Sequence, residues 1–164
     1  MTKNLIVKRE IRALGLDLCE PQCLTGAVTR GGDYLDGVLV LPSKPTLKNM
    51  LIASAIRNSR FFSELRLIMT HDPETRLDPN VIERSTKLPV VQVDATKKTQ
   101  SEGFESYKIG RKHLLVRSSL PPRILQKILS TTWTTGMLPE PLRIAHLLAR
   151  SRFFAKNARF QANK

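Results

Sequence analysis

Cysteines, acidic residues and long apolar runs are all scarce in this chain, and each shortage excludes a class of protein. Two cysteines occur among 164 residues, Cys19 and Cys23. A C-x-x-x-C pair with no second pair and no histidine nearby in the sequence does not favour a zinc site. Thiols without a metal are the simpler expectation, and a disulfide is expected only if the source is hyperthermophilic.

No stretch of the sequence approaches the roughly 18 apolar residues that a membrane span requires. The opening segment is short and mixed in character, unlike a secretory signal. We therefore expect a soluble, cytoplasmic protein with no membrane partner. The chain also lacks internal repeats and low-complexity segments.

Acidic residues are outnumbered, and the imbalance is uneven along the chain. There are 27 Lys and Arg against 14 Asp and Glu, a net charge of +13. From residue 106 to the end, twelve basic residues accompany a single acid, Glu140. A one-sided positive field attracts polyanions, which predicts nucleic acid, DNA in the first instance, as the partner. A solubilising or thermophilic surface is the alternative, although thermophilic surfaces usually mix both signs.

The length fits one domain over residues 1–164, and 41% hydrophobic residues can form its core. Apolar runs bounded by turn residues predict buried strands at Ile11–Asp17, Leu24–Thr29, Tyr34–Leu41, Arg66–Thr70 and Leu88–Val93. Gly31-Gly32 supplies a hairpin turn between the second and third strands. The segment 97–107 is expected to be a loop, and 108–117 a strand or irregular.

Four helices are expected between and after these strands. They lie from a cap at Ser43 or Thr46 to about Phe61, at Asn80–Ser85, from Pro121-Pro122 to about Thr132, and from about residue 139 into a basic tail. The apolar residues at helical spacing should face the sheet: Leu47, Leu51, Ile52, Ala55 and Ile56 in the first helix, and Ile144, Leu147 and Leu148 in the last. This order of elements predicts a layered α/β fold with a mixed sheet and flanking helices.

Two acids occupy comparable positions after predicted strands. Asp17 ends the first strand, and Asp72 lies just past the fourth. If those strands are neighbours, their ends converge, and two carboxylates there could bind Mg²⁺ or Mn²⁺ for phosphodiester hydrolysis. The alternative is that each acid belongs to a turn or caps a helix.

The final helix carries a second group of candidate residues. Arg143, His146 and Arg150 are spaced by three and four, so they form one stripe that could contact a phosphate or assist proton transfer. A solvated helix face is the alternative. The tail adds four further basic residues and three phenylalanines that could contact single-stranded nucleic acid or pack into the core: Arg152, Lys156, Arg159, Lys164, Phe153, Phe154 and Phe160.

At these residues the sequence resembles the archaeal endonuclease dU-like proteins, relatives of endonuclease V. The segment Leu138–Arg150 (LPEPLRIAHLLAR) is the most specific match, and weaker ones cover Ile11–Asp17, Leu67–Glu83 and Leu88–Val93. The resemblance implies a ribonuclease H-like fold and metal-dependent cleavage of DNA that contains deaminated bases. It also implies that Asp17 and Asp72 are metal ligands and that His146 and Arg143 lie near the scissile phosphate.

The sequence departs from that family at three places. The family doubles the acid after the first strand, whereas Leu18 and Cys19 follow Asp17 here. The acidic motif after the third strand is replaced by Leu41–Thr46, which has no acid and contains Lys44, a residue that could bind phosphate. The family's Gly-Phe is replaced by Asp78-Pro79.

Three functions remain open at this point, and the oligomeric state is not predicted. The first is a catalytic endonuclease, in which Glu20 or Asp36 could replace a lost ligand. The second is a non-catalytic nucleic-acid-binding relative with a degenerate acidic site. The third is a protein-interaction module that presents its basic face to an acidic partner.

Overall fold

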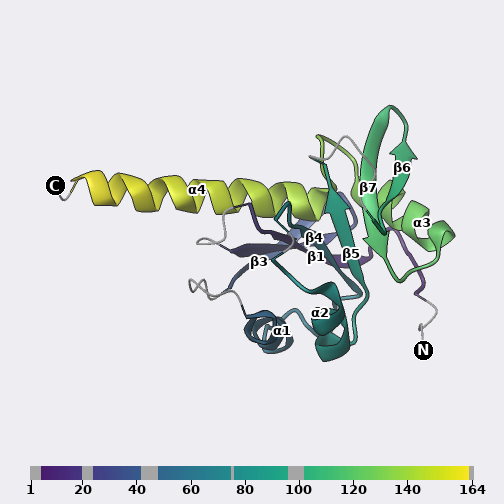
Figure 1. Ribbon diagram of the computed structural model, residues 1–164, viewed down its shortest axis with the longest axis horizontal. Coiled ribbons are helices and arrows are strands. Elements are labelled where there is room, and N and C mark those ends of the chain that lie inside the picture. The colour runs from purple at the N-terminus through teal and green to yellow at the C-terminus, as the bar shows by residue number, and fades with distance from the viewer. Residues whose placement is uncertain (1–4, 20–23, 42–47, 75, 96–101, 163–164) are drawn as a thin grey trace.

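The computed structural model describes residues 5–19, 24–41, 48–74, 76–95 and 102–162, without the side chains of 153, 154 and 156–162 (Figure 1). Seven strands of this part form one mixed sheet in the order β3-β2-β1-β4-β5-β7-β6. They are β1 (Arg12–Asp17), β2 (Thr25–Arg30), β3 (Tyr34–Val40), β4 (Leu67–His71), β5 (Val90–Asp94), β6 (Glu105–Ile109) and β7 (Lys112–Ser118).

The central strands β1, β4 and β5 are parallel to one another. Burial on both faces explains their near-continuous apolar sequences, because helices cover both sides of such strands. The outer strands β2, β3, β7 and β6 pair antiparallel, which hairpins allow without a crossover. The expected mixed α/β sheet is therefore confirmed.

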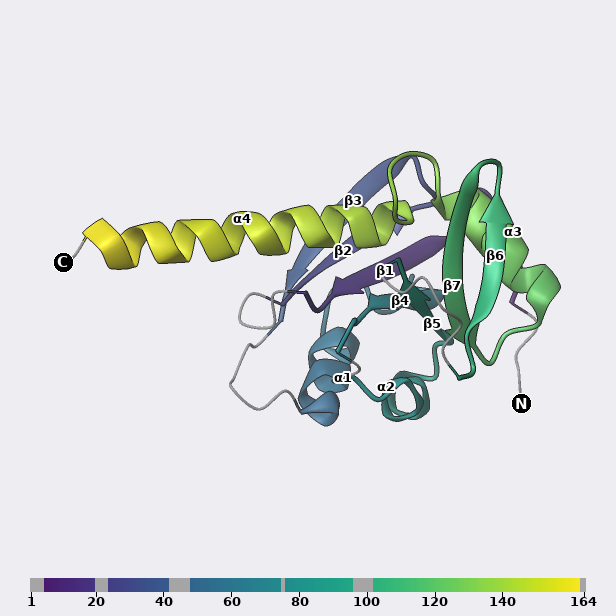
Figure 2. The same ribbon diagram turned by 45° about the horizontal axis from the view of Figure 1, so that its top comes forward.

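Two helical layers cover the sheet (Figure 2). One face carries α3 (Pro122–Thr132) and α4 (Glu140–Ala162), and the other carries α1 (Asn49–Arg57) and α2 (Pro79–Thr86). On the first face, Met69 and Val91 of the sheet pack with Ile128 of α3 and Leu142 of α4. On the second face, the buried cluster comprises, among others, Leu14, Ile68, Ile52, Ile56 and Ile82.

Helix α4 approaches β1 unusually closely through small residues. A Cβ atom on Gly15 would lie 2.2 Å from both the carbonyl carbon and the oxygen of Pro141, so only glycine fits there. The buried face of this helix comprises Leu142, Ala145 and Ala149. The expectation that Leu147 faces the core is wrong, because its side chain is 53% exposed. Ile144 and Leu148, expected on the same buried face, are only partly buried.

Helix α1 begins and ends inside the range expected from sequence. Lys48 precedes its first residue and makes no side-chain capping bond. The expected caps Ser43 and Thr46, with Leu47, lie outside the described residues. Ile52, Ala53 and Ile56 form the buried face, whereas Leu51 is 44% exposed and Ala55 only partly buried. The buried face of α1 therefore includes Ala53 in place of Leu51 and differs from the face expected from the sequence.

The segment after β5 forms a hairpin that sequence reasoning missed. Gly110 has a φ of +60° and turns the chain between β6 and β7, as a tight hairpin requires. The loop expected over 97–107 is wrong for Glu105–Tyr107, which belong to β6, while 96–101 lie outside the described residues. Strand β6 is mostly exposed, so it lacks the apolar run that identifies a buried strand.

Candidate metal and nucleic-acid site

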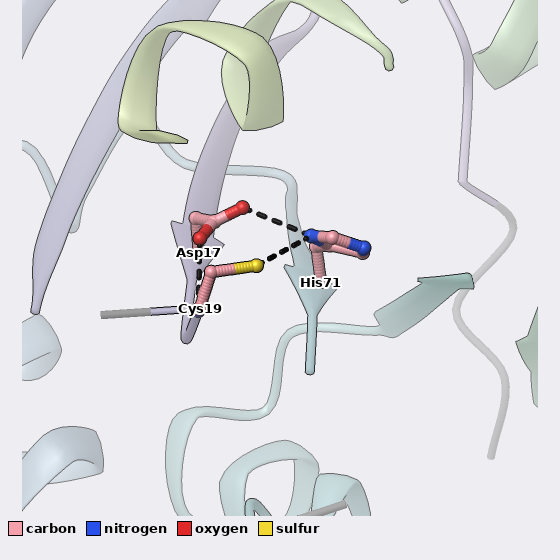
Figure 3. Close-up of side chains that lie close together, drawn as sticks. All are labelled: Asp17, Cys19 and His71. Carbon is pink, nitrogen blue, oxygen red and sulfur yellow. Dashed lines mark hydrogen bonds and ion pairs between the residues drawn. The ribbon is translucent and has the colours of Figure 1, made fainter. Parts of the chain in front are cut away.

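The candidate site lies at the carboxyl ends of β1 and β4, beneath the first turns of α4 (Figure 3). Asp17 and His71 are the last residues of these strands and are directly opposite each other in the parallel ladder. Both side chains point to the face that α4 covers, and His146 of α4 reaches the same carboxylate. Asp17 is fully buried and His71 is 4% exposed.

Three polar groups contact the Asp17 carboxylate, and the thiol of Cys19 lies beside one of them, the His71 ring. Nδ1 of His71 lies 2.9 Å from Oδ2 of Asp17, and Nδ1 of His146 lies 3.2 Å from the same oxygen. The backbone N–H of Cys19 donates to Oδ1 at 2.9 Å. The Sγ of Cys19 lies 3.5 Å from Nδ1 of His71. One buried carboxylate thus lies among two imidazoles and a thiol.

The environment keeps this carboxylate ionised. Burial alone would raise the pKa of Asp17, since it penalises the charged form. The hydrogen bonds from His71 and from the Cys19 amide, with the attraction of the His71 and His146 imidazoles, outweigh that effect. The pKa of Asp17 is therefore lowered from its usual value of 3.8, and a negative charge persists there at neutral pH.

Three of these residues could share one metal ion. One ligand atom each of Asp17, Cys19 and His71 lie within 4.8 Å of one another. His146 contacts Asp17 but is not part of this mutually close set. Figure 3 shows the outer ring nitrogen of His71, Nε2, pointing away from the carboxylate and thiol. Nδ1 is therefore the nitrogen that faces the cluster.

Asp72 does not join this cluster. Its Oδ2 accepts a hydrogen bond from the backbone N–H of Leu77 at 2.7 Å. Its Oδ1 lies 3.7 Å from Nε of Arg76, whose guanidinium also donates to the carbonyl oxygen of Leu18. Asp72 thus stabilises the connection between β4 and α2. The structure brings together two of the residues selected from sequence, Asp17 and His146, and keeps the third apart.

The selected basic residues are found in different environments. Arg143 forms a two-bond ion pair with Glu140, at 2.5 and 2.8 Å. Arg152 is exposed, and its Nη1 donates to Oγ1 of Thr25 at 3.0 Å. Arg150 is also exposed. Lys44 lies outside the described residues, as do the side chains of Lys156 and Arg159.

Sequence reasoning missed His71 and Cys19. The fourth strand was expected to end at Thr70, so His71 was assigned to the following loop, and the next acid, Asp72, was selected in its place. The strand runs one residue further. Cys19 was judged without a histidine nearby in the sequence, yet His71 lies beside it across the sheet. A signal was available, because residues at the carboxyl ends of parallel strands converge whatever their type.

The fold is ribonuclease H-like and is shared with endonuclease V. Endonuclease V from Bacillus subtilis superposes with a TM-score of 0.56 at 13% identity, over 96% of this chain and 88% of that one. Ciona intestinalis endonuclease V, solved with a 24mer DNA containing an inosine followed by a ribo-adenosine, gives 0.56 at 10% identity, over 88% and 87%. Marinitoga piezophila Argonaute, in complex with guide RNA and target DNA, gives 0.52 at 14% identity over 90% of this chain and 30% of its own.

Closer relatives define the family. The UPF0215 protein of Methanosarcina mazei is 31% identical over 91% of this chain and 94% of its own length. The homologue from Methanosarcina acetivorans is 30% identical over 96% and 98%. A protein of unknown function from Archaeoglobus fulgidus has a TM-score of 0.68 at 25% identity, over 86% of this chain and 97% of its own. The chain belongs to the UPF0215 family. No protein-family model matches it.

None of the helices that the structure describes is both long and apolar enough to cross a bilayer.

Proposed function

We propose that this protein binds nucleic acid and processes it at Asp17, as an endonuclease-like repair protein of the endonuclease dU-like kind. The observation that carries the proposal is the buried, ionised Asp17 at the carboxyl end of β1, contacted by His71 and His146. The fold of the protein is also that of endonuclease V, and one endonuclease V was solved with inosine-containing DNA. Deaminated DNA is therefore the proposed substrate.

His146 is the group best placed to meet a substrate. Its side chain is 28% exposed, whereas those of Asp17 and His71 are almost fully enclosed. A partly exposed imidazole beside a carboxylate can donate a hydrogen bond to a phosphate or move a proton near one. Asp17 would orient the His146 ring through the contact at Nδ1, which leaves Nε2 to face the nucleic acid.

The expected Mg²⁺ or Mn²⁺ fits the described residues poorly. These ions prefer oxygen ligands and, for Mg²⁺, a nearly regular octahedron. Within the part of the chain that the structure describes, the cluster supplies one carboxylate, one imidazole and one thiol. The Oδ2 of Asp72 already accepts a hydrogen bond from the Leu77 amide, and its Oδ1, which is buried without a hydrogen-bond partner, lies 3.7 Å from the Arg76 cation that would repel a metal ion.

A non-catalytic nucleic-acid-binding role is the second candidate. Residues 41–46 contain no acid, and the Asp72 carboxylate is already engaged in the β4–α2 connection. The strongly basic region after residue 106 would serve binding in either case. Salt-sensitive binding of nucleic acid without hydrolysis is the signature of this second role.

The deciding experiment compares cleavage and binding in the same preparations. DNA containing deoxyuridine or hypoxanthine is incubated with the wild-type chain, Asp17→Asn and the matched control Asp36→Asn, with Mg²⁺, Mn²⁺ or Zn²⁺. Cleavage that is lost in Asp17→Asn but kept in Asp36→Asn supports the proposal. Binding without cleavage by the wild type favours the second role. Absence of binding at low salt contradicts both.

A further inference from the structure

We infer that Asp17, Cys19 and His71 form a binding site for a borderline transition-metal ion of the Zn²⁺ or Co²⁺ type. The inference deepens the proposed function and rests on it for the role of the ion, because the ion would bind the same carboxylate. Binding itself is measured without any cleavage. The donor set, the distances and the positions of the donors in the fold each support it.

The donor set contains one oxygen, one nitrogen and one sulfur. Zn²⁺ takes imidazole nitrogen, thiolate sulfur and carboxylate oxygen together, whereas Mg²⁺ and Ca²⁺ select oxygen. A thiolate beside an imidazole is a combination that the hard ions do not use. The chemistry of Cys19 and His71 therefore selects against the ions expected from sequence.

Two of the three distances between the donor atoms can be compared with those of a tetrahedral site. With Zn–N of about 2.05 Å and Zn–S of about 2.3 Å, two ligands at the tetrahedral angle lie about 3.5 Å apart, and two nitrogen or oxygen ligands lie about 3.3 Å apart. The Sγ of Cys19 is 3.5 Å from Nδ1 of His71, and Oδ2 of Asp17 is 2.9 Å from the same nitrogen. The distance between Cys19 and His71 fits as it stands, whereas the distance between Asp17 and His71 needs to widen by about 0.4 Å.

The donors are already held in place by their surroundings. Asp17 and His71 are ladder partners in the sheet. The Cys19 amide holds Oδ1 of Asp17 at 2.9 Å, which turns Oδ2 toward His71. His146, at 3.2 Å from Oδ2, would act as an outer partner that orients the carboxylate, as such groups do around bound zinc. Three protein ligands leave a coordination position for water or a phosphate oxygen.

The competing interpretation is a hydrogen-bonded cluster without metal, in which Asp17 contacts the two imidazoles alone. That arrangement explains the contacts of His71 and His146 with Asp17. It does not depend on the Cys19 thiol that lies beside His71. The two interpretations differ in whether the thiol matters for any bound ion, and this difference can be tested directly.

The test uses the full chain, stripped with a chelator and kept under reductant. Equilibrium dialysis against Zn²⁺, Co²⁺ or Mg²⁺, followed by metal analysis, measures the affinities. We expect stoichiometric Zn²⁺ at least about 100-fold tighter than Mg²⁺, and a Co²⁺ form with a near-ultraviolet thiolate charge-transfer band. Cys19→Ser should remove that band and weaken Zn²⁺ binding by about 10- to 100-fold or more, as the loss of even an outer partner does.

Matched variants keep the result interpretable. Asp36→Asn should leave both the affinity and the band unchanged, because Asp36 is held by Arg12 and Arg30. His71→Gln should weaken Zn²⁺ binding, and circular dichroism checks that it is folded. Mg²⁺ bound as tightly as Zn²⁺, a Co²⁺ spectrum without the band, or binding that survives Cys19→Ser overturns the inference. Cleavage that persists in Cys19→Ser after Zn²⁺ binding is lost overturns the role of the ion in cleavage, but leaves both the metal site and the proposed function at Asp17 intact.

Discussion

A carboxylate lies near each end of β1, and each one is contacted by two nitrogen-bearing side chains. At one end these side chains are guanidinium groups, and at the other end they are imidazoles. At the amino end, Asp36 accepts hydrogen bonds from Arg12 at 2.8 Å and from Arg30 at 2.6 Å. At the carboxyl end, Asp17 lies between His71 and His146. The Asp36 side chain is 15% exposed, whereas that of Asp17 is fully enclosed.

The difference separates a structural ion pair from a site that can exchange its partners. Guanidinium groups keep their charge and have no lone pair to offer, so the Asp36 cluster can only join β1, β2 and β3. Imidazoles gain or lose a proton near neutral pH and bind metals through a ring nitrogen. The carboxyl end of β1 is therefore the end where a ligand or proton can be exchanged, and four predictions concern the two ends of β1 and the helix that packs on it.

The largest effect is expected from separating α4 from β1. Gly15→Ala places a Cβ against the Pro141 backbone, which cannot give way as a side chain would. We expect a loss of about 3 kcal/mol or more in unfolding free energy, measured by urea denaturation. Gly26→Ala is the control, because its Cβ meets only side-chain atoms of Leu14, Leu16 and Leu39. Equal losses in the two variants would show that the α4 contact is not tight.

The next effect compares the two carboxylates by removing one partner from each. In metal-free protein, His71→Ala leaves the fully buried Asp17 charge short of a hydrogen-bond donor, and a loss of about 3 kcal/mol is expected. Arg12→Ala should cost about 1 kcal/mol or less, since its pair is partly solvated. Urea unfolding at neutral pH measures both. If Arg12→Ala proves the more costly, the assignment of the two ends is reversed.

A smaller effect concerns acid stability at the amino end. The hydrogen bond from Arg30 outweighs the effect of burial and, with Arg12, holds the pKa of Asp36 below its usual 3.8. A lowered folded-state pKa adds stability that is present above the usual value and is lost as pH falls through the lowered one. Asp36→Asn should therefore unfold with a shallower pH dependence below about pH 4, and with a Tm about 2–4 °C lower at neutral pH. An unchanged slope in a pH series of thermal melts would contradict this.

The smallest effect concerns nucleic-acid binding. Arg152 donates to Thr25, the register partner of Asp17 on β2, so its charge lies at the carboxyl end of β1. Arg152→Ala should lower DNA affinity several-fold and reduce the slope of log affinity against log salt by about 1. Arg9, exposed near Asp33 at the other end, is the matched control. Fluorescence anisotropy titrations at several salt concentrations measure both, and an equal loss in Arg9→Ala would argue for a diffuse basic surface.

The sheet and one half of the site were predictable from the sequence. Apolar runs in the sequence predict the buried strands, and Asp17 is a candidate because it ends one of these runs. His71 was missed because a strand boundary was placed one residue early, and the preference of Mg²⁺ for oxygen then favoured Asp72. Strand ends are fixed by pairing with neighbours, and local sequence does not carry that information.

The buried face of α4 was predicted wrongly for a different physical reason. Hydrophobic patterning selects the largest apolar side chains as the inward face, here Ile144, Leu147 and Leu148. The helix instead packs through Ala145 and Ala149 at a distance that only small residues allow. Gly15 on β1 indicates this close approach, but only once α4 and β1 are known to be in contact.

The ladder pairing of Asp17 with His71 has a mechanical consequence. The spacing of their backbones is set by the interstrand distance of about 4.8 Å, and widening it would require breaking hydrogen bonds in the middle of the sheet. The two backbones are therefore held at a fixed separation, and any change in the distance between the donor atoms of Asp17 and His71 has to come from rotation of their side chains.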